Sequence, residues 1–212
     1  MADILQEMAS NLYNGDEEAV AGLVQKALDQ GMAPEEILSG GLIGGMDEVG
    51  KDFKAGDLFV PEVLIAARAM SAGMNVLRPL LAEGDTISAG KCVIGTVKGD
   101  LHDIGKNLVK MMLEGAGFQT IDLGTDVDAA TFVSAAQEHQ PDLLGMSALL
   151  TTTMVNMKGV IEALVEAGVR DSVKIMVGGA PVTAAFAEEI GADAYAPDAA
   201  TAVDISRELT GK

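Results

Sequence analysis

The second half of the chain alternates short apolar segments with helical segments, and this alternation restricts the possible fold more than any other feature. Each apolar segment is short and bounded by turn residues, as is typical of a buried strand. Five strand–helix pairs in succession predict a parallel sheet with helices on both faces. The predicted strands cover 92–97, 119–123, 142–146, 174–177 and 193–196, and the predicted helices cover 104–114, 128–138, 153–168, 182–190 and 199–209.

The first half of the chain contains only helical patterns. Asp16 is suited to cap a helix, and Pro34 and Pro61 are suited to the first turns of two later helices. Apolar residues of the last helix recur at alternating spacings of four and three, the seam pattern of a helix bundle. They are Val63, Ala67, Met70, Met74 and Leu77. We therefore predict a four-helix bundle in domain 1–88, a polar linker at 82–91, and an α/β domain at 89–212.

Composition excludes several classes of function. The formal net charge of −18 makes a nucleic acid or an anionic membrane an unsuitable partner, because binding phosphates requires concentrated Lys and Arg. The sequence contains neither an apolar run long enough to span a bilayer nor a basic, apolar leader, so we expect a cytoplasmic protein. The single cysteine, Cys92, excludes an intramolecular disulfide and a zinc cluster built from cysteines.

Ligands of open parallel sheets bind at the carboxyl ends of the strands, which directs attention to the loop 98–107. This loop holds His102, one of only two histidines. One interpretation is structural: Asp103 caps the next helix and His102 lies on the surface. A phosphate loop does not match, because five residues separate Gly99 from Gly105 and Asn107 replaces the hydroxyl residue that would hold magnesium. A hydrolytic dyad of Asp100 and His102 lacks a neighbouring nucleophile.

The remaining interpretation is that His102 binds a metal. A neutral imidazole binds a transition metal through one nitrogen, and its second N–H commonly donates to a carboxylate that fixes the tautomer. Asp100, two residues earlier, is suited to be that carboxylate. No other cluster of ligating residues is evident, so the protein would supply one ligand and an organic macrocycle the others.

The pattern Asp100-x-His102-x-x-Gly105 resembles the cobalamin-binding motif of methionine synthase, methylmalonyl-CoA mutase and the corrinoid proteins of methyltransferase systems. Two further matches follow in the family's order. Ser147-Ala148-Leu149 begins 45 residues after His102, and Gly178-Gly179-Ala180 begins 31 residues after Ser147. The resemblance implies a flavodoxin- or Rossmann-like cobalamin-binding domain with five parallel strands.

In this family the cofactor's own lower base is displaced from cobalt by a histidine, which implies that His102 is the cobalt ligand. The resemblance also implies a relay of His102, Asp100 and Thr153. The displaced nucleotide tail would extend past small or hydroxylated residues at the strand ends. The residues implied in cofactor binding are Gly99, Asp100, Leu101, His102, Asp103, Gly105, Ser147, Leu149, Thr151, Gly178, Gly179 and Ala199.

The segments 45–53 and 59–64 look like the helical cap of methionine synthase and of methylamine, methanol and glycine betaine corrinoid proteins. The resemblance implies that Phe53 and Val60 cover the methyl group on cobalt. It implies a methyl carrier that works with three partners: a substrate-specific methyltransferase, a second methyltransferase acting on tetrahydrofolate or a thiol, and a reductive activation protein. An adenosylcobalamin-binding mutase subunit and a corrinoid-dependent sensor are the alternatives. Motion of the cap would use the linker at 82–91 as a hinge.

Overall fold

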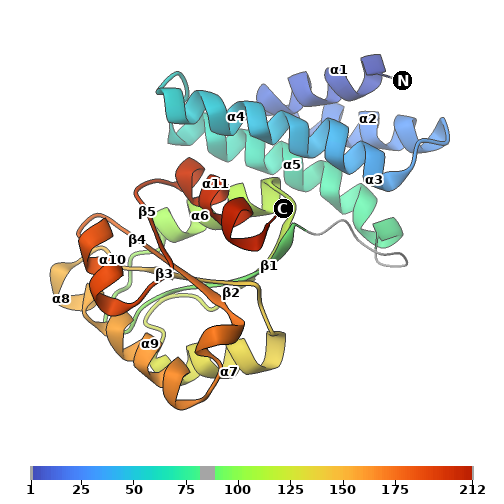
Figure 1. Ribbon diagram of the computed structural model, residues 1–212. Helices are drawn as coiled ribbons and strands as arrows, with labels where there is room; N and C mark the ends of the chain where they lie inside the picture. Colours follow the sequence, from blue (N-terminus) through green and yellow to red (C-terminus); the bar gives the residue numbers. More distant parts are fainter. Residues whose placement is uncertain (1, 82–88, 212) are drawn as a thin grey trace. The chain divides into compact units, whose positions relative to one another are not determined.

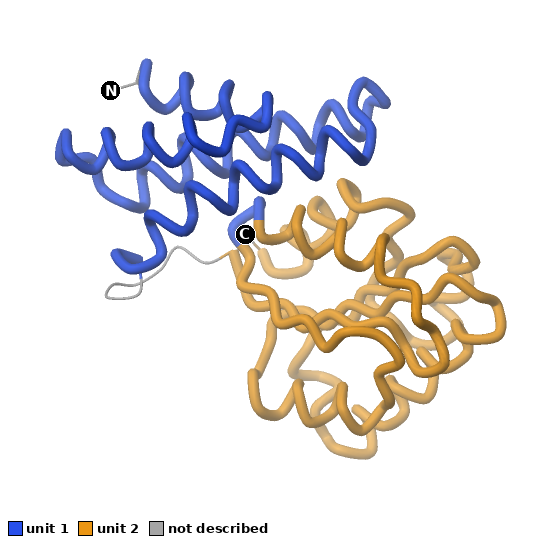
Figure 2. Tube along the Cα trace, turned by 180° about the vertical axis from the view of Figure 1, so that it is seen from behind, with its two compact units in different colours: residues 1–88, 115–117 blue, residues 89–114, 118–212 orange. Residues whose placement is uncertain are grey.

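The computed structural model describes residues 2–81 and 89–211 (Figure 1). The chain divides into two compact units, coloured separately in Figure 2: residues 1–88 with 115–117 form unit 1, and 89–114 with 118–212 form unit 2. Most of the predicted linker at 82–91 lies outside the described residues, but its last two residues begin the first strand. No helix in the described ranges has both the length and the apolar character needed to cross a bilayer.

Unit 2 contains one sheet of five parallel strands in the order β2-β1-β3-β4-β5, which confirms the predicted fold. The central strands are almost wholly buried, because helices cover both faces of the sheet. The strand order reverses beside β1, and ligands bind at such switch points in open α/β sheets. The strands are β1 Gly90–Thr96, β2 Phe118–Asp122, β3 Leu143–Ser147, β4 Lys174–Gly178 and β5 Ala194–Ala196.

Figure 1 shows α7, α9 and α10 on one face of the sheet and α6 and α11 on the other. The core between the sheet and α7, α9 and α10 includes Phe132, Leu144, Met157 and Ile175. The helix predicted at 153–168 instead begins at Thr151 and is divided at Val155. The helical elements are α6 Ile104–Gly115, α7 Ala129–His139, α8 Thr151–Met154, α9 Asn156–Glu166, the 3₁₀ turn η2 Arg170–Ser172, α10 Ala184–Ile190 and α11 Ala199–Thr210.

Unit 1 is the predicted helix bundle. Asp16 caps α2 as expected, since its carboxylate accepts a hydrogen bond from the Ala19 N–H at 3.0 Å. A left-handed Gly56 ends α4. The elements are α1 Ala2–Tyr13, α2 Glu17–Asp29, α3 Pro34–Ile37, η1 Leu38–Ile43, α4 Gly44–Ala55 and α5 Val60–Leu81.

The third helix differs from the prediction because η1 is a π-helical segment. The apolar residues Leu38, Leu42 and Met46 are spaced by four, and all three are buried. This spacing alone does not require a π-helix, because residues four apart also lie on one face of an α-helix. The segment also contains Gly40 and Gly41, which are weak helix formers. The apolar pattern did not predict this local departure from α-helical geometry.

Candidate functional site

Three loops meet at the carboxyl edge of the sheet in unit 2 because the ends of three neighbouring strands are in register. Thr96 of β1 pairs with Ser147 of β3, which in turn pairs with Gly178 of β4. Beyond the strand ends, the Val97 N–H donates to the Ser147 carbonyl at 3.0 Å, and the Ala148 N–H donates to the Gly178 carbonyl at 3.3 Å. The predicted motifs, which lie far apart in the sequence, are thus brought to one edge.

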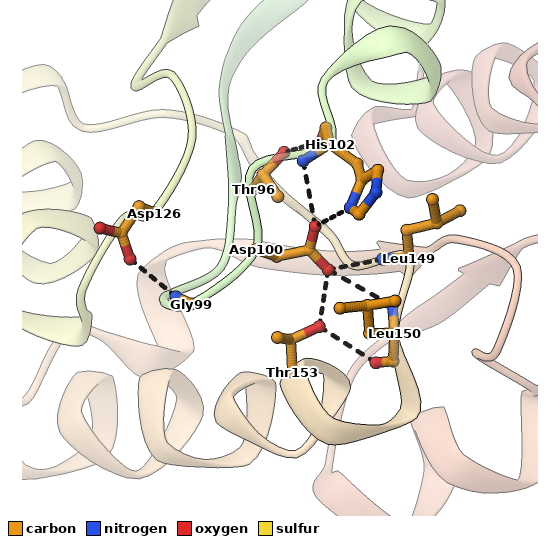
Figure 3. A network of polar contacts seen from close by, with 8 residues as sticks. All are labelled: Thr96, Gly99, Asp100, His102, Asp126, Leu149, Leu150 and Thr153. Atoms are coloured by element: carbon orange, nitrogen blue, oxygen red, sulfur yellow. Dashed lines mark hydrogen bonds and ion pairs between the residues drawn. The ribbon is translucent and has the colours of Figure 1, made fainter.

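Asp100 is at the centre of the site, and its side chain is fully buried (Figure 3). Its Oδ2 accepts hydrogen bonds from the Thr153 hydroxyl at 2.6 Å and from the Leu149 N–H at 2.8 Å. Its Oδ1 accepts a bond from the His102 N–H at 3.1 Å and lies 2.7 Å from the His102 ring Nδ1. The structure therefore brings together His102, Asp100 and Thr153 in the order that the family resemblance implied.

These contacts favour one tautomer of His102. Burial raises the pKa of the Asp100 carboxyl, but the hydrogen bonds from Thr153, Leu149 and His102 outweigh it and hold the pKa well below its usual range. An ionised carboxylate only accepts hydrogen bonds, so the proton between the two side chains belongs to Nδ1. The Nε2 of a neutral His102 therefore carries a free lone pair, which is what a metal ligand requires.

His102 lies on an exposed, apolar surface. Its side chain is 52% exposed, and the flanking Leu101 and Ile104 are 73% and 79% exposed. Leu149 and Leu150, from the β3–α8 loop, are also exposed large apolar side chains. Gathered apolar side chains in water are unfavourable, and such patches mark binding sites. The arrangement is suited to a ligand that offers apolar surface beside the imidazole.

No group of three or more His, Cys, Asp or Glu side chains able to hold a metal is found within residues 2–81 and 89–211. Cys92 is buried in β1, and burial raises the pKa of its thiol to about 12, so it remains protonated at neutral pH. Within the described residues His102 therefore belongs to no metal site built from several such side chains, and its role as a metal ligand stays a prediction.

Two glycines at the end of β4 allow neighbouring backbone segments to pack closely. Gly179 has a φ of +123°, and a Cβ added there would lie 1.9 Å from the Ala148 carbonyl oxygen. A Cβ at Gly178 would lie 2.9 Å from the Ala196 carbonyl oxygen. The resemblance gave these glycines a role in making room for a ligand, and the structure shows that the backbone of the protein itself requires them.

The other predicted residues occupy separate places. Asp103 is exposed and accepts a hydrogen bond from the Asn107 side chain at 3.0 Å. Phe53 and Val60 belong to unit 1, where Phe53 is half-buried and Val60 is exposed, and their covering role stays a prediction. Gly99 lies in the loop that carries His102, and Gly105 lies in the first turn of α6. Ser147 is half-buried at the end of β3, and Thr151 is exposed at the start of α8. Ala199 is buried at the start of α11.

Sequence reasoning missed the groups that hold this loop in place. The Thr96 hydroxyl donates to the His102 carbonyl at 2.9 Å, and Asp126 accepts a bond from the Gly99 N–H at 2.7 Å. Lys106 is buried, and its ammonium donates to Asp122 at 2.6 Å. A lysine is seldom fully buried unless it is paired. The sequence offered only one weak signal for this contact, an acidic residue at the end of a predicted strand.

The Lys106–Asp122 contact gives a testable dependence of stability on pH. Partial burial raises the pKa of Asp122, but hydrogen bonds from Lys106 and the Gly124 N–H outweigh it and lower the pKa. The stabilisation is thus complete above the unfolded pKa of about 3.9 and is lost as the pH falls through the lower native pKa. We expect Asp122→Asn to reduce the free energy of unfolding by about 1–2 kcal/mol at pH 7 and by progressively less toward pH 2.

Urea unfolding at a series of pH values measures this effect. The matched control is Lys110→Met, because Lys110 contacts the same carboxylate at 3.4 Å and is more exposed than Lys106. We expect that control to cost less than about 0.5 kcal/mol. If Asp122→Asn reduced the free energy of unfolding by the same amount at every pH, the stabilisation would not come from the ionised carboxylate of Asp122.

Comparison with known proteins adds independent information. A family description, B12 binding domain, matches residues 90–204, and a second description of the same name matches residues 4–78. The dimethylamine corrinoid protein of Methanosarcina barkeri is 48% identical over 208 residues, which cover 98% of this chain and 97% of that protein.

Two solved structures are similar over nearly the whole chain. The methanol:cobalamin methyltransferase complex MtaBC of Methanosarcina barkeri contains a chain 30% identical, with a TM-score of 0.90, covering 99% of this chain and 80% of that one. A cobalamin-binding protein of Desulfitobacterium hafniense DCB-2 is 32% identical, with a TM-score of 0.80, covering 97% and 98%. These matches span both units, and this chain therefore belongs to the cobalamin-binding corrinoid protein family of methylamine and methanol methyltransferase systems.

Proposed function

We propose that this chain carries a methyl group on bound cobalamin between two methyltransferases. The observation that supports this most strongly is the half-exposed His102, whose Nδ1 is engaged by an ionised Asp100 and whose Nε2 is free. When bound, cobalamin supplies a cobalt centre that accepts a methyl group from one substrate and yields it to another. Membership of the corrinoid family supports the carrier role, since family members are named for dimethylamine and methanol systems.

The residues of the site fit this cofactor. His102 would be the lower ligand of cobalt, and Leu101 and Ile104 supply apolar surface beside it. The buried relay behind the imidazole matches the requirement that a metal-ligating histidine be oriented through its second nitrogen. The remaining cofactor-binding assignments stay proposals: Gly99, Asp103, Gly105, Ser147, Leu149, Thr151, Gly178, Gly179 and Ala199.

The protein's own groups act on the proton and the orientation of the imidazole. Asp100 keeps the proton on Nδ1 of a neutral His102, and the Thr153 hydroxyl donates to the opposite carboxylate oxygen. If cobalamin is bound, Nε2 of His102 would be the ligand atom, and the contact of Nδ1 with Asp100 would hold the orientation of the ring.

We infer three protein partners. The first is a substrate-specific methyltransferase, which the MtaBC complex supports because a similar chain is part of it. The others are a methyltransferase that delivers the methyl group to tetrahydrofolate or a thiol, and a reductive activation protein. Covering of the methyl group by Phe53 and Val60 and a cytoplasmic location complete the proposal.

The direct test follows an isotope-labelled methyl group. The full chain is loaded with cobalamin, reduced, and incubated with methanol or a mono-, di- or trimethylamine together with the corresponding methyltransferase. We expect label to stay with the protein for one donor class, and to leave when tetrahydrofolate or a thiol is added with its methyltransferase. Failure to retain label with every donor would contradict the carrier role. An adenosylated cofactor on the protein purified from its natural cells would favour the mutase alternative.

A further inference from the structure

Asp126 adopts an unusual backbone conformation close to the site. It lies in the connection between β2 and α7, with a φ of +56°. The only other described residue besides glycine with a positive φ is Gln140, which ends α7. Left-handed backbone is unfavourable for residues with a Cβ and is retained where surrounding contacts require it. Asp126 is exposed, so burial of its side chain does not explain the conformation.

Two hydrogen bonds join Asp126 to the loop that carries the relay. Its carboxylate Oδ1 accepts a bond from the Gly99 N–H at 2.7 Å (Figure 3). Its own N–H donates to the Asp100 carbonyl at 3.0 Å. Gly99 itself has a φ of +81°. One bond thus holds the N–H of Gly99 and the other holds the carbonyl of Asp100. Together they fix the backbone from which the Asp100 side chain extends.

We propose that Asp126 is a positioning residue for His102 and acts through the backbone of Asp100. The buried end of Asp100 is held by Thr153 and Leu149, but these contacts reach only its carboxylate. Asp126 holds the main chain at the other end of that side chain. With both ends fixed, Oδ1 stays within hydrogen-bond distance of the imidazole Nδ1. The functional part of this inference rests on the proposed function, in which His102 is the cobalt ligand.

Three substitutions separate this role from an ordinary turn. Asp126→Asn keeps an acceptor oxygen and a residue type that tolerates left-handed backbone. Asp126→Gly keeps the conformation and removes the acceptor, and Asp126→Ala removes both. If Asp126 positions the loop, Asn retains the wild-type behaviour while Gly and Ala both lose it. If Asp126 only forms a turn, Gly behaves like the wild type and Ala alone is defective.

The measurement is ¹⁵N NMR of the imidazole groups in the full chain near pH 8, where histidine is mostly neutral. The chain has two histidines, so His139 is an internal reference. We expect Asp126→Gly and Asp126→Ala to lower the ratio of Nδ1–H to Nε2–H tautomers of His102 by about three- to tenfold, comparable to the loss of one hydrogen bond of ordinary net strength. Asp126→Asn should stay within about twofold of the wild type. Affinity for hydroxocobalamin should fall in the same order.

Asp128→Ala is the matched control. Asp128 is two residues away and caps α7 by accepting a bond from the Thr131 N–H at 2.9 Å. Removing the Asp128 carboxylate destabilises α7 and leaves the hydrogen bonds of Asp126 in place. A wild-type tautomer ratio in Asp126→Gly, or an equal shift in Asp128→Ala, would overturn the proposal. The NMR measurement does not require bound cobalamin. The positioning role of Asp126 can therefore be refuted while His102 still binds cobalt, and it can be supported even if His102 does not bind cobalt.

Discussion

Replacing His102 with alanine is expected to weaken binding of cobalamin by more than about 100-fold, because even loss of an outer contact to a metal ligand commonly costs 10–100-fold. The bound pigment should also change its absorption spectrum to that of cobalamin without a lower nitrogen ligand. The physical reason is that, in the proposed function, the imidazole would form a coordinate bond to cobalt, whereas the apolar side chains around His102 offer only surface contact.

Titration of the apo chain with hydroxocobalamin, followed by absorbance, measures both effects. The matched control is His139→Ala, since His139 is the second histidine and lies at the far end of α7. It should leave both affinity and spectrum unchanged. If the His102 variant gives the same spectrum as the wild type, His102 is not the lower ligand and the proposed function loses its main support.

Gly179→Ala is expected to have the largest effect on stability. The new Cβ would lie 1.9 Å from the Ala148 carbonyl oxygen, far inside van der Waals contact, and the φ of +123° is unfavourable for alanine. Both the β3–α8 and β4–α10 loops would have to move. We expect a loss of more than about 4 kcal/mol in the free energy of unfolding, or failure to fold.

Gly168→Ala is the comparison that isolates the steric clash. Gly168 also has a left-handed φ, +70°, but a Cβ there would meet no atom within 4 Å. It should cost only about 1–2 kcal/mol, the conformational penalty alone. Urea unfolding of both variants measures the two losses in the free energy of unfolding. Equal losses would show that the close approach to Ala148 relaxes without cost, and the packing role assigned to Gly179 would then be wrong.

The fold was largely readable from the sequence because its signals are local. Strands, helices and the change from bundle to sheet follow from the spacing of apolar residues along a few turns. Departures occurred where the backbone geometry changes within a continuous apolar pattern. The π-helical segment Leu38–Ile43 contains buried apolar residues whose spacing would suit an α-helix equally well. Likewise the division of the helix at Val155 has no counterpart in the apolar pattern.

The sequence by itself determined the chemistry of the site: one histidine in a strand-to-helix loop, a carboxylate two residues before it, and a resemblance that added Thr153. Only the tertiary structure decided how that chemistry is held. Parallel register brings Leu149 and Thr153 onto Asp100 across about 50 residues of sequence, and it places Asp126 against Gly99 and Asp122 against Lys106. Such contacts leave no periodic trace in the sequence, because they depend on which strand ends become neighbours in the folded sheet.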